Sequence, residues 1–256
     1  MEPIVNKFEL IKKAEIRKDL FDFTVYAPEI AKIAVSGQFL HIKCGDEFSL
    51  RRPISICEIN AETIRFIFEI RGDGTDKLSK FKVGDFIDIL GPLGNGFEDR
   101  DYSKKAVFVG GGIGIFPLLD VAKKYKNNAI VLLGFKDKAS SSLILDFENA
   151  GCIVKVATDD GSLGINGFVT DYFKDLSNDI DTIYACGPSV MIKKTATFAN
   201  DKKIKCLVSL EERMGCGIGA CLVCACKTKD NHGNEGYSHV CKNGPIFDSK
   251  EVVFDD

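Results

Sequence analysis

The stretch GGGIGIFP, residues 110–117, joins an apolar run typical of a buried strand, AVFVG, to a run typical of a helix, IFPLLDVAKKYK. A glycine-rich turn between a strand and a helix can offer backbone N–H groups and the helix dipole to a phosphate. The stretch is not a strict dinucleotide fingerprint, because Pro117 stands where the third glycine would fall, counted from Gly112. It predicts a strand, a turn and a helix. The turn is either a nucleotide-binding loop or a tight turn needed only for packing, and its candidate residues are Gly111, Gly112, Ile113 and Gly114.

The same alternation of strand and helix patterns continues toward residue 210, through AIVLLGF, SLILDFENAG, CIVKVATDD, FVTDYFKDL, DTIYACG, PSVMIKKTATFA and KCLVSL. Such alternation predicts a parallel sheet covered by helices, which we place at residues 99–209. Cys186, Gly187 and Pro188 end a late strand and open a helix, at the sheet edge where such folds bind ligands. Cys186 is either a buried thiol or a neighbour of a nicotinamide, and its position favours the second interpretation.

Upstream of this region the pattern is different. Residues 8–90 form a series of β-rich runs, FELIKKAEI, LFDFTVYAP, GQFLHIKC, RPISICEI, TIRFIFEI and DFIDIL, with one helical turn expected at KLSKF. Regularly spaced short strands separated by Gly, Pro and Asp favour an antiparallel barrel. We therefore expect a barrel domain over residues 1–98.

Two strand ends of this barrel carry polar residues that suit a flavin dinucleotide. An arginine can pair with a pyrophosphate, a serine hydroxyl can bond a flavin nitrogen, and a Gly-Thr turn can offer N–H groups to phosphate. Taken alone these signals are weak, because the same residues also suit an ordinary strand end with a surface arginine. The candidate residues are Arg52, Pro53, Ile54, Ser55, Glu69, Ile70, Arg71, Gly74 and Thr75.

The cysteines near the C-terminus give the most specific signal. Cys216, Cys221 and Cys224 are spaced C-x4-C-x2-C, and Cys241 follows after sixteen residues. This is the plant-type [2Fe–2S] spacing, and the adjacent glycines allow the backbone to approach a cluster closely. A zinc site usually shows two separated C-x2-C pairs, and a disulfide or merely buried set is the other alternative. Cys226 falls outside the pattern and is expected to be an ordinary small apolar residue.

The remainder of residues 210–256 is loop-like and rich in Gly and Asn. A segment of this composition builds little apolar core, so we expect a metal centre to stabilise it as a small iron–sulfur domain. Nothing in the sequence makes His41, His232 or His239 a ligand or a base. No convincing catalytic triad or carboxylate pair is found, so no catalytic residue is predicted.

The composition of the chain argues against several classes of protein. The 256 residues carry a net charge of -3 without a basic block, which argues against a nucleic-acid partner. The N-terminus lacks a signal-peptide pattern, and the longest weakly polar run, residues 106–122, is too short to span a bilayer, so we expect a cytoplasmic protein. Ten cysteines in such a chain indicate metal or redox chemistry rather than a disulfide framework.

The motifs of the barrel, the α/β region and the cysteine tail are far more specific in combination than singly. A barrel with R-P-x-S, then G-G-G-I-G-I-x-P, then C-G-P resembles the ferredoxin–NADP reductase family over roughly residues 4 to 210. The tail SLEERMGCGIGACLVC, followed by Cys241 and NGPIF, is similar to the electron-transfer subunits of type B dihydroorotate dehydrogenase over essentially the whole chain.

This resemblance implies FAD on the barrel, NAD on the second domain and a [2Fe–2S] cluster on the four cysteines. It also implies a catalytic partner subunit that carries FMN and oxidises dihydroorotate in pyrimidine biosynthesis, with two copies of each chain. Electrons would then pass from FMN through the cluster and FAD to NAD+. The alternatives are a reductase subunit that serves ferredoxin or polysulfide in a different complex, and a zinc-stapled interaction module without redox activity.

Overall fold

The computed structural model of the chain describes residues 2–230 and 232–254. Its N-terminal part is a closed antiparallel barrel with the strand order β1-β2-β5-β4-β3-β6. The barrel predicted from the sequence is therefore confirmed, although β1 is longer than the short strand expected. Two short helices, α1 (Pro28–Ala31) and α2 (Asp73–Ser79), accompany strands β1 (Ile4–Arg17), β2 (Leu20–Tyr26), β3 (Phe39–Ile42), β4 (Arg52–Ile59), β5 (Thr63–Glu69) and β6 (Phe86–Leu93).

The second part is a sheet with the strand order β10-β9-β8-β7-β11-β12-β15. All its pairings are parallel except that of β15 with β12, which confirms the predicted parallel sheet. The strands are β7 (Lys105–Gly111), β8 (Ala129–Phe135), β9 (Ile153–Thr158), β10 (Ile165–Asn166), β11 (Ile180–Cys186), β12 (Lys205–Ser209) and β15 (Ile246–Asp248). The helices are α3 (Leu119–Tyr125), α4 (Ile144–Asn149) and α5 (Ser189–Asp201), with 3-10 turns at η1 (Gly112–Leu118), η2 (Lys126–Asn128), η3 (Lys138–Ser140) and η4 (Val169–Asp175).

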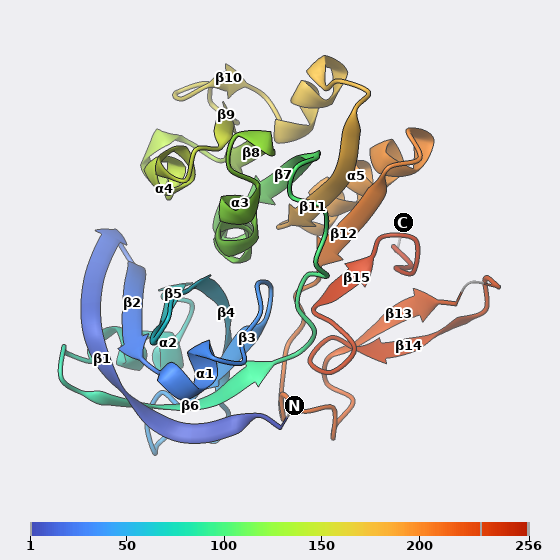
Figure 1. Ribbon diagram of the computed structural model, residues 1–256. Helices are drawn as coiled ribbons and strands as arrows, with labels where there is room; N and C mark the ends of the chain where they lie inside the picture. The colour runs from blue at the N-terminus through green and yellow to red at the C-terminus, as the bar shows by residue number, and fades with distance from the viewer. Residues whose placement is uncertain (1, 231, 255–256) are drawn as a thin grey trace.

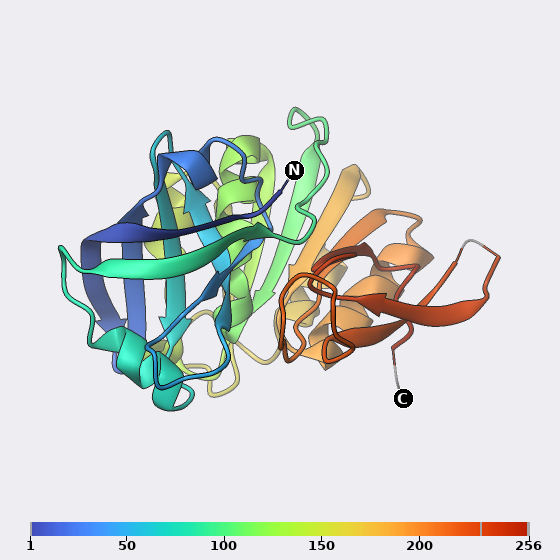
Figure 2. The same cartoon turned by 90° about the horizontal axis from the view of Figure 1, so that it is seen from below.

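The C-terminal part is less loop-like than its composition predicts. Strands β13 (Ala225–Lys229) and β14 (Glu235–His239) form a hairpin, and β15 adds an edge strand to the large sheet. The hairpin strands are largely exposed and polar, so they show none of the apolar alternation that identifies a half-buried strand. Figure 2 shows this part beside both the barrel and the sheet.

Charged side chains join the barrel to the α/β part. Arg65 on β5 makes ion pairs with Asp22 at 2.8 Å and with Asp146 of α4 at 2.6 Å. Asp120 of α3 accepts hydrogen bonds from the Ser36 hydroxyl and the Ile59 amide. These contacts fix the position of the loop between β7 and α3 relative to the barrel wall. No helix in the described part of the chain is long and apolar enough to cross a membrane.

Candidate functional site

A cavity of about 280 Å3 opens where the barrel meets the other two parts. Its barrel wall contains most of the residues proposed for a flavin, namely Arg52, Pro53, Ile54, Ser55, Glu69, Arg71 and Thr75. Its remaining lining residues were not predicted as binding residues, and they include Phe39 of β3, Phe116 of η1, and Leu210, Met214 and Pro245. The fold therefore closes around a site that the barrel sequence specifies only on one side.

Arg52 and the α2 turn contact each other closely in this cavity. A Cβ atom added at Gly74 would lie 2.7 Å from the Arg52 guanidinium, so a larger residue there would displace this group. The Thr75 hydroxyl donates to the Gly72 carbonyl and accepts from the Arg71 amide, so it orders the turn itself. Arg52 and Arg71 both bring positive charge to the cavity wall.

Glu69 is held by two arginines. Its carboxylate makes ion pairs with Arg17 at 2.9 Å and with Arg71 at 2.7 Å. Ile70 and Gly74, also proposed from the sequence, are not among the residues that line the cavity. Gly74 instead lies against the Arg52 guanidinium.

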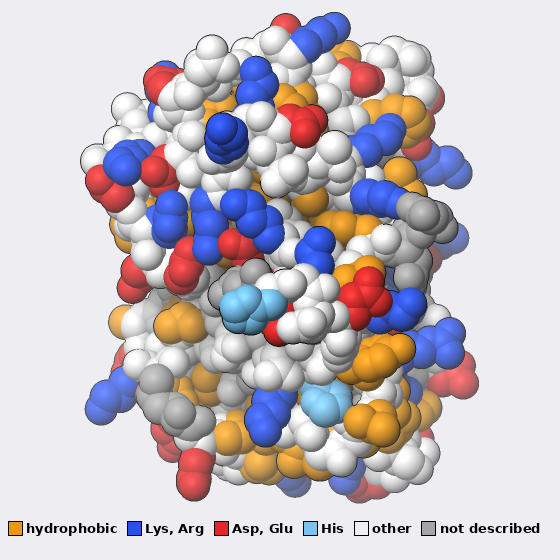
Figure 3. Space-filling view, turned by 90° about the vertical axis from the view of Figure 1, so that its right-hand side faces the viewer, with side chains coloured by type: hydrophobic (Ala, Val, Ile, Leu, Met, Phe, Trp, Pro, Cys, Tyr) orange, Lys and Arg blue, Asp and Glu red, His pale blue; other side chains and the backbone are white. Residues whose placement is uncertain are grey.

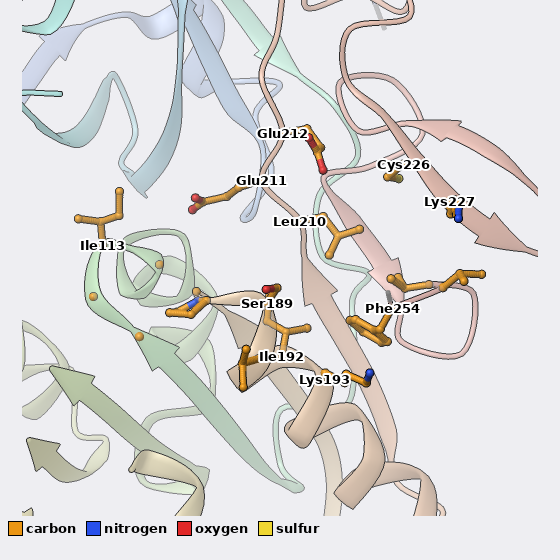
Figure 4. Close-up of a pocket in the computed structure, with 18 of the residues that line it drawn as sticks. Ile113, Ser189, Ile192, Lys193, Leu210, Glu211, Glu212, Cys226, Lys227 and Phe254 are labelled. Atoms are coloured by element: carbon orange, nitrogen blue, oxygen red, sulfur yellow. The ribbon is translucent and has the colours of Figure 1, made fainter. Parts of the chain in front are cut away.

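A second cavity, of about 800 Å3, adjoins the first (Figure 4). We call it the nucleotide-side cavity, and the first one the flavin-side cavity. Gly111, Gly112, Ile113 and Gly114 line it together with Gly187 and Pro188, so the fold brings both proposed nucleotide motifs to one place. Residues of the C-terminal part, including Tyr237 and Phe254, form the opposite side. The helix expected directly after the turn begins only at Leu119, because the turn continues as the 3-10 segment that contains Pro117.

The two nucleotide motifs touch through their backbones. A Cβ atom at Gly114 would lie 2.5 Å from the Cys186 carbonyl oxygen, and one at Gly187 would lie 2.9 Å from the Gly111 amide nitrogen. The Cys186 thiol itself is buried and is not among the cavity-lining residues. Burial raises the pKa of this thiol well above its usual range.

The two cavities share one boundary. Arg71, Ile113, Leu210, Glu211 and Glu212 line both of them. Figure 4 shows Glu211 pointing toward the side where Ile113 lies, away from the end of the cavity with Lys193 and Phe254. Burial against the cavity walls raises the pKa of Glu211, and the Arg71 charge opposes that shift. Groups bound in the two cavities would therefore meet at this boundary.

The four proposed ligand cysteines come together as two pairs of thiols. Cys216 interacts with Cys221, and Cys224 interacts with Cys241. The amide of Gly219 donates to the Cys241 sulfur at 3.1 Å, and that of Ala220 donates to the Cys216 sulfur at 3.2 Å. Two thiol pairs with N–H groups directed at sulfur are compatible with the four-thiolate ligand set of a [2Fe–2S] cluster.

Burial and these contacts shift the pKa values of the Cys216 and Cys241 thiols in opposite directions. Partial burial opposes ionisation of Cys216, but the amides of Ile218 and Ala220 and the Cys221 thiol lower its pKa to about 6. Burial, followed by the Cys224 thiol, raises the pKa of Cys241 to about 12. Within residues 2–230 and 232–254, no group of three or more His, Cys, Asp or Glu side chains is placed to hold a metal ion.

Cys226 lies apart from the thiol pairs. It belongs to β13, donates its thiol to the Ser238 carbonyl at 3.5 Å, and lines the nucleotide-side cavity. We expect Cys226→Ser to retain about two irons and two sulfides per chain, because a hydroxyl can keep the bond to Ser238. Iron and sulfide analysis checks this result. Loss of iron in this variant, together with retention in Cys241→Ser, would reverse the ligand assignment.

The chain matches the family model described as the iron-sulfur cluster binding domain of dihydroorotate dehydrogenase B over residues 211–253. It is 42% identical to a dihydroorotate dehydrogenase B (NAD(+)) electron transfer subunit from Caldanaerobacter subterraneus, over 85% of this chain and 87% of that protein. A protein of the same name from Bacillus cereus is 38% identical over 95% of this chain and 96% of its own length.

Solved structures show the same architecture. A chain of the NADH-dependent reduced ferredoxin-NADP oxidoreductase is 31% identical, with a TM-score of 0.85 over 96% of this chain and 90% of that one. A ferredoxin NADP+ reductase from Neisseria gonorrhoeae, 16% identical, has a TM-score of 0.64 over 77% of this chain and 91% of its own. The second likeness concerns the fold alone.

Proposed function

The chain belongs to the family of electron transfer subunits of dihydroorotate dehydrogenase B, and on that basis we propose how its own residues carry electrons between a catalytic partner and NAD+. Its redox groups are FAD, a [2Fe–2S] cluster and the nicotinamide nucleotide. One observation supports this path of electron transfer most directly. The segment that follows β12 lines both cavities at Leu210 and Glu211, reaches the flavin-side cavity again at Met214, and enters the cysteine loop at Cys216.

We assign FAD to the flavin-side cavity, NAD to the nucleotide-side cavity, and the cluster to Cys216, Cys221, Cys224 and Cys241. A bound flavin supplies the exchange between two-electron hydride chemistry and one-electron transfer. Around it, Arg52 offers a positive charge for phosphate. Gly114 and Gly187 let the two nucleotide loops approach closely, and the walls of the shared boundary limit the access of water. We infer the domain boundaries 1–98, 99–209 and 210–256 from these assignments.

Arg52→Ala should weaken FAD binding, because it removes a charge-assisted contact worth about 1.5–3 kcal/mol, or roughly 10- to 150-fold in affinity. Gly74→Ala should act in the same direction, since its methyl group would displace the guanidinium. Flavin fluorescence titration of the apoprotein measures both effects. Gly236→Ala serves as the control, because a Cβ there meets nothing within 4 Å and its φ lies outside the left-handed region. Unchanged affinity in Arg52→Ala would remove this arginine from the site.

The partner should dock against the cysteine loop, because electron transfer requires the cluster to face its donor. The loop exposes three apolar side chains, with Ile218, Leu222 and Val223 at 51%, 78% and 55% exposure. Figure 3 shows hydrophobic side chains on the lower part of the face formed largely by the C-terminal part. We propose that this loop contacts an FMN-bearing catalytic subunit in an assembly with two copies of each chain.

Anaerobic purification of the chain from its native cell tests the partner assignment. The co-purifying protein should carry FMN and oxidise dihydroorotate. A ferredoxin- or polysulfide-dependent subunit in its place would favour the related reductase complexes instead.

A further inference from the structure

His41 is a buried histidine to which neither the sequence nor the family names assign a role. It lies on β3, where Leu40 and Ile42 pack into the barrel core, so His41 points to the opposite face of the strand. Its Cα partner on the neighbouring strand β4 is Pro53, inside the R-P-x-S stretch proposed for the flavin. The side chain therefore projects outward from β3, next to the strand proposed for the flavin.

The cysteine loop covers this side chain. His41 is only 1% exposed, and a Cβ atom added at Gly217 would lie 2.5 Å from its Nδ1 atom. Gly217 has a positive φ of 74° and directly follows Cys216. The imidazole thus fills the space between the barrel wall and the start of the cluster loop, and any larger residue at position 217 would press on the ring.

Neither ring nitrogen of His41 has a hydrogen-bond partner within the described residues. The backbone groups of Arg51 and Cys216 lie near the ring without reaching hydrogen-bond geometry. An imidazole carries at least one N–H donor in either protonation state, and a buried donor without an acceptor is unfavourable.

A cluster held by Cys216 would bring sulfur acceptors to this loop. The ring contacts the loop at Cys216 and Gly217, and the Cys216 sulfur already accepts from the amides of Ile218 and Ala220. Sulfur atoms of iron–sulfur groups accept such bonds, and the bonds stabilise the more negative, reduced state. A donor from the barrel would therefore favour reduction of the cluster.

We propose that His41 is a positioning residue for the [2Fe–2S] cluster, donating its ring N–H to a sulfur of the bound group and fixing the cysteine loop to β3 of the barrel. This inference rests on the proposed function, because it requires the cluster on Cys216. It gives the barrel a direct influence on the cluster's reduction potential. Because β3 pairs with β4, which carries Pro53, it would also hold the cluster at a constant position relative to the flavin.

The test uses the full chain loaded with FAD and cluster, and it measures the midpoint potential of the cluster by a redox titration followed by electron paramagnetic resonance. His41→Leu should lower the potential by about 59 mV, which corresponds to a tenfold change in the one-electron reduction equilibrium. His41→Gln should restore most of the difference, because its amide keeps an N–H donor. Gly217→Ala should lower the potential as well, since the added methyl group displaces the ring.

Gly233→Ala is the control for the glycine change, because Gly233 has a similar positive φ of 83° but a Cβ there meets nothing within 4 Å. An unchanged potential in His41→Leu with full cluster content would overturn the proposal, as would equal shifts in His41→Leu and His41→Gln. If His41→Leu loses the cluster, Gly217→Ala decides, and an unchanged potential there is contrary to the proposal. Absence of iron from the unmodified chain would instead overturn the proposed function.

Discussion

Cys221→Ser is expected to reduce the dihydroorotate-dependent reduction of NAD+ by the assembled complex to background. Cys221 forms one of the two thiol pairs with Cys216, so its replacement leaves an incomplete donor set for one iron. The residue lines neither cavity, so NADH oxidation with a dye as acceptor should stay close to that of the unmodified protein. The two assays, run on the same preparation, separate the cluster from the flavin and nucleotide sites.

The matched control is Cys226→Ser, which makes the same chemical change five residues away at a thiol bonded to Ser238. It should retain both activities. Full coupling to NAD+ in a Cys221→Ser preparation that contains no iron would show that electrons bypass the cluster. Equal loss of dye reduction would indicate a general loss of folding instead.

Gly114→Ala is expected to lower NADH oxidation with a dye by roughly 100-fold, the cost of a shift of about 1 Å in a reacting group. The new methyl group would lie 2.5 Å from the Cys186 carbonyl oxygen and 2.6 Å from the Gly187 Cα atom. These are backbone atoms, so the two loops that line the nucleotide-side cavity must separate. Steady-state kinetics with NADH and dye measure the effect.

The cluster signal and iron content of Gly114→Ala should remain normal, because the atoms nearest to a Cβ at position 114 belong to Cys186 and Gly187 and not to the cysteine loop. Gly236→Ala adds the same methyl group in open space and is expected to keep full activity. Turnover in Gly114→Ala equal to that of this control would mean that the close approach of the two loops does not shape the nucleotide site.

The barrel and the parallel sheet could be predicted because their strands carry strong local patterns. β4 and β8 begin and end where their apolar runs do, at Arg52–Ile59 and Ala129–Phe135. The hairpin of β13 and β14 could not be predicted in this way, since its strands are polar and exposed. β15 is a short strand at the sheet edge, and its pairing with β12 depends on the tertiary fold.

The residues of the candidate site likewise fall into those that a local sequence pattern predicts and those that only the tertiary fold brings in. The cysteine spacing and the two glycine motifs are local, and the fold brings each of these sets together. Glu211 reaches the cavity wall only because the segment after β12 lies against the barrel, and Phe39 belongs to an ordinary apolar run, so neither residue was predicted to bind a cofactor. His41 is the clearest example, because its contact is with Gly217, far along the chain, and its own strand shows only an ordinary buried position.

The most direct test of the central claim is an assay of dihydroorotate-dependent NAD+ reduction with the chain alone and after addition of the separately purified FMN-bearing subunit. The chain alone should oxidise NADH with a dye but show no activity with dihydroorotate, and addition of the partner should create NADH formation. Dihydroorotate oxidation by the chain alone, or no NADH formation by a complex that contains FMN, FAD and the cluster, would contradict the proposed role.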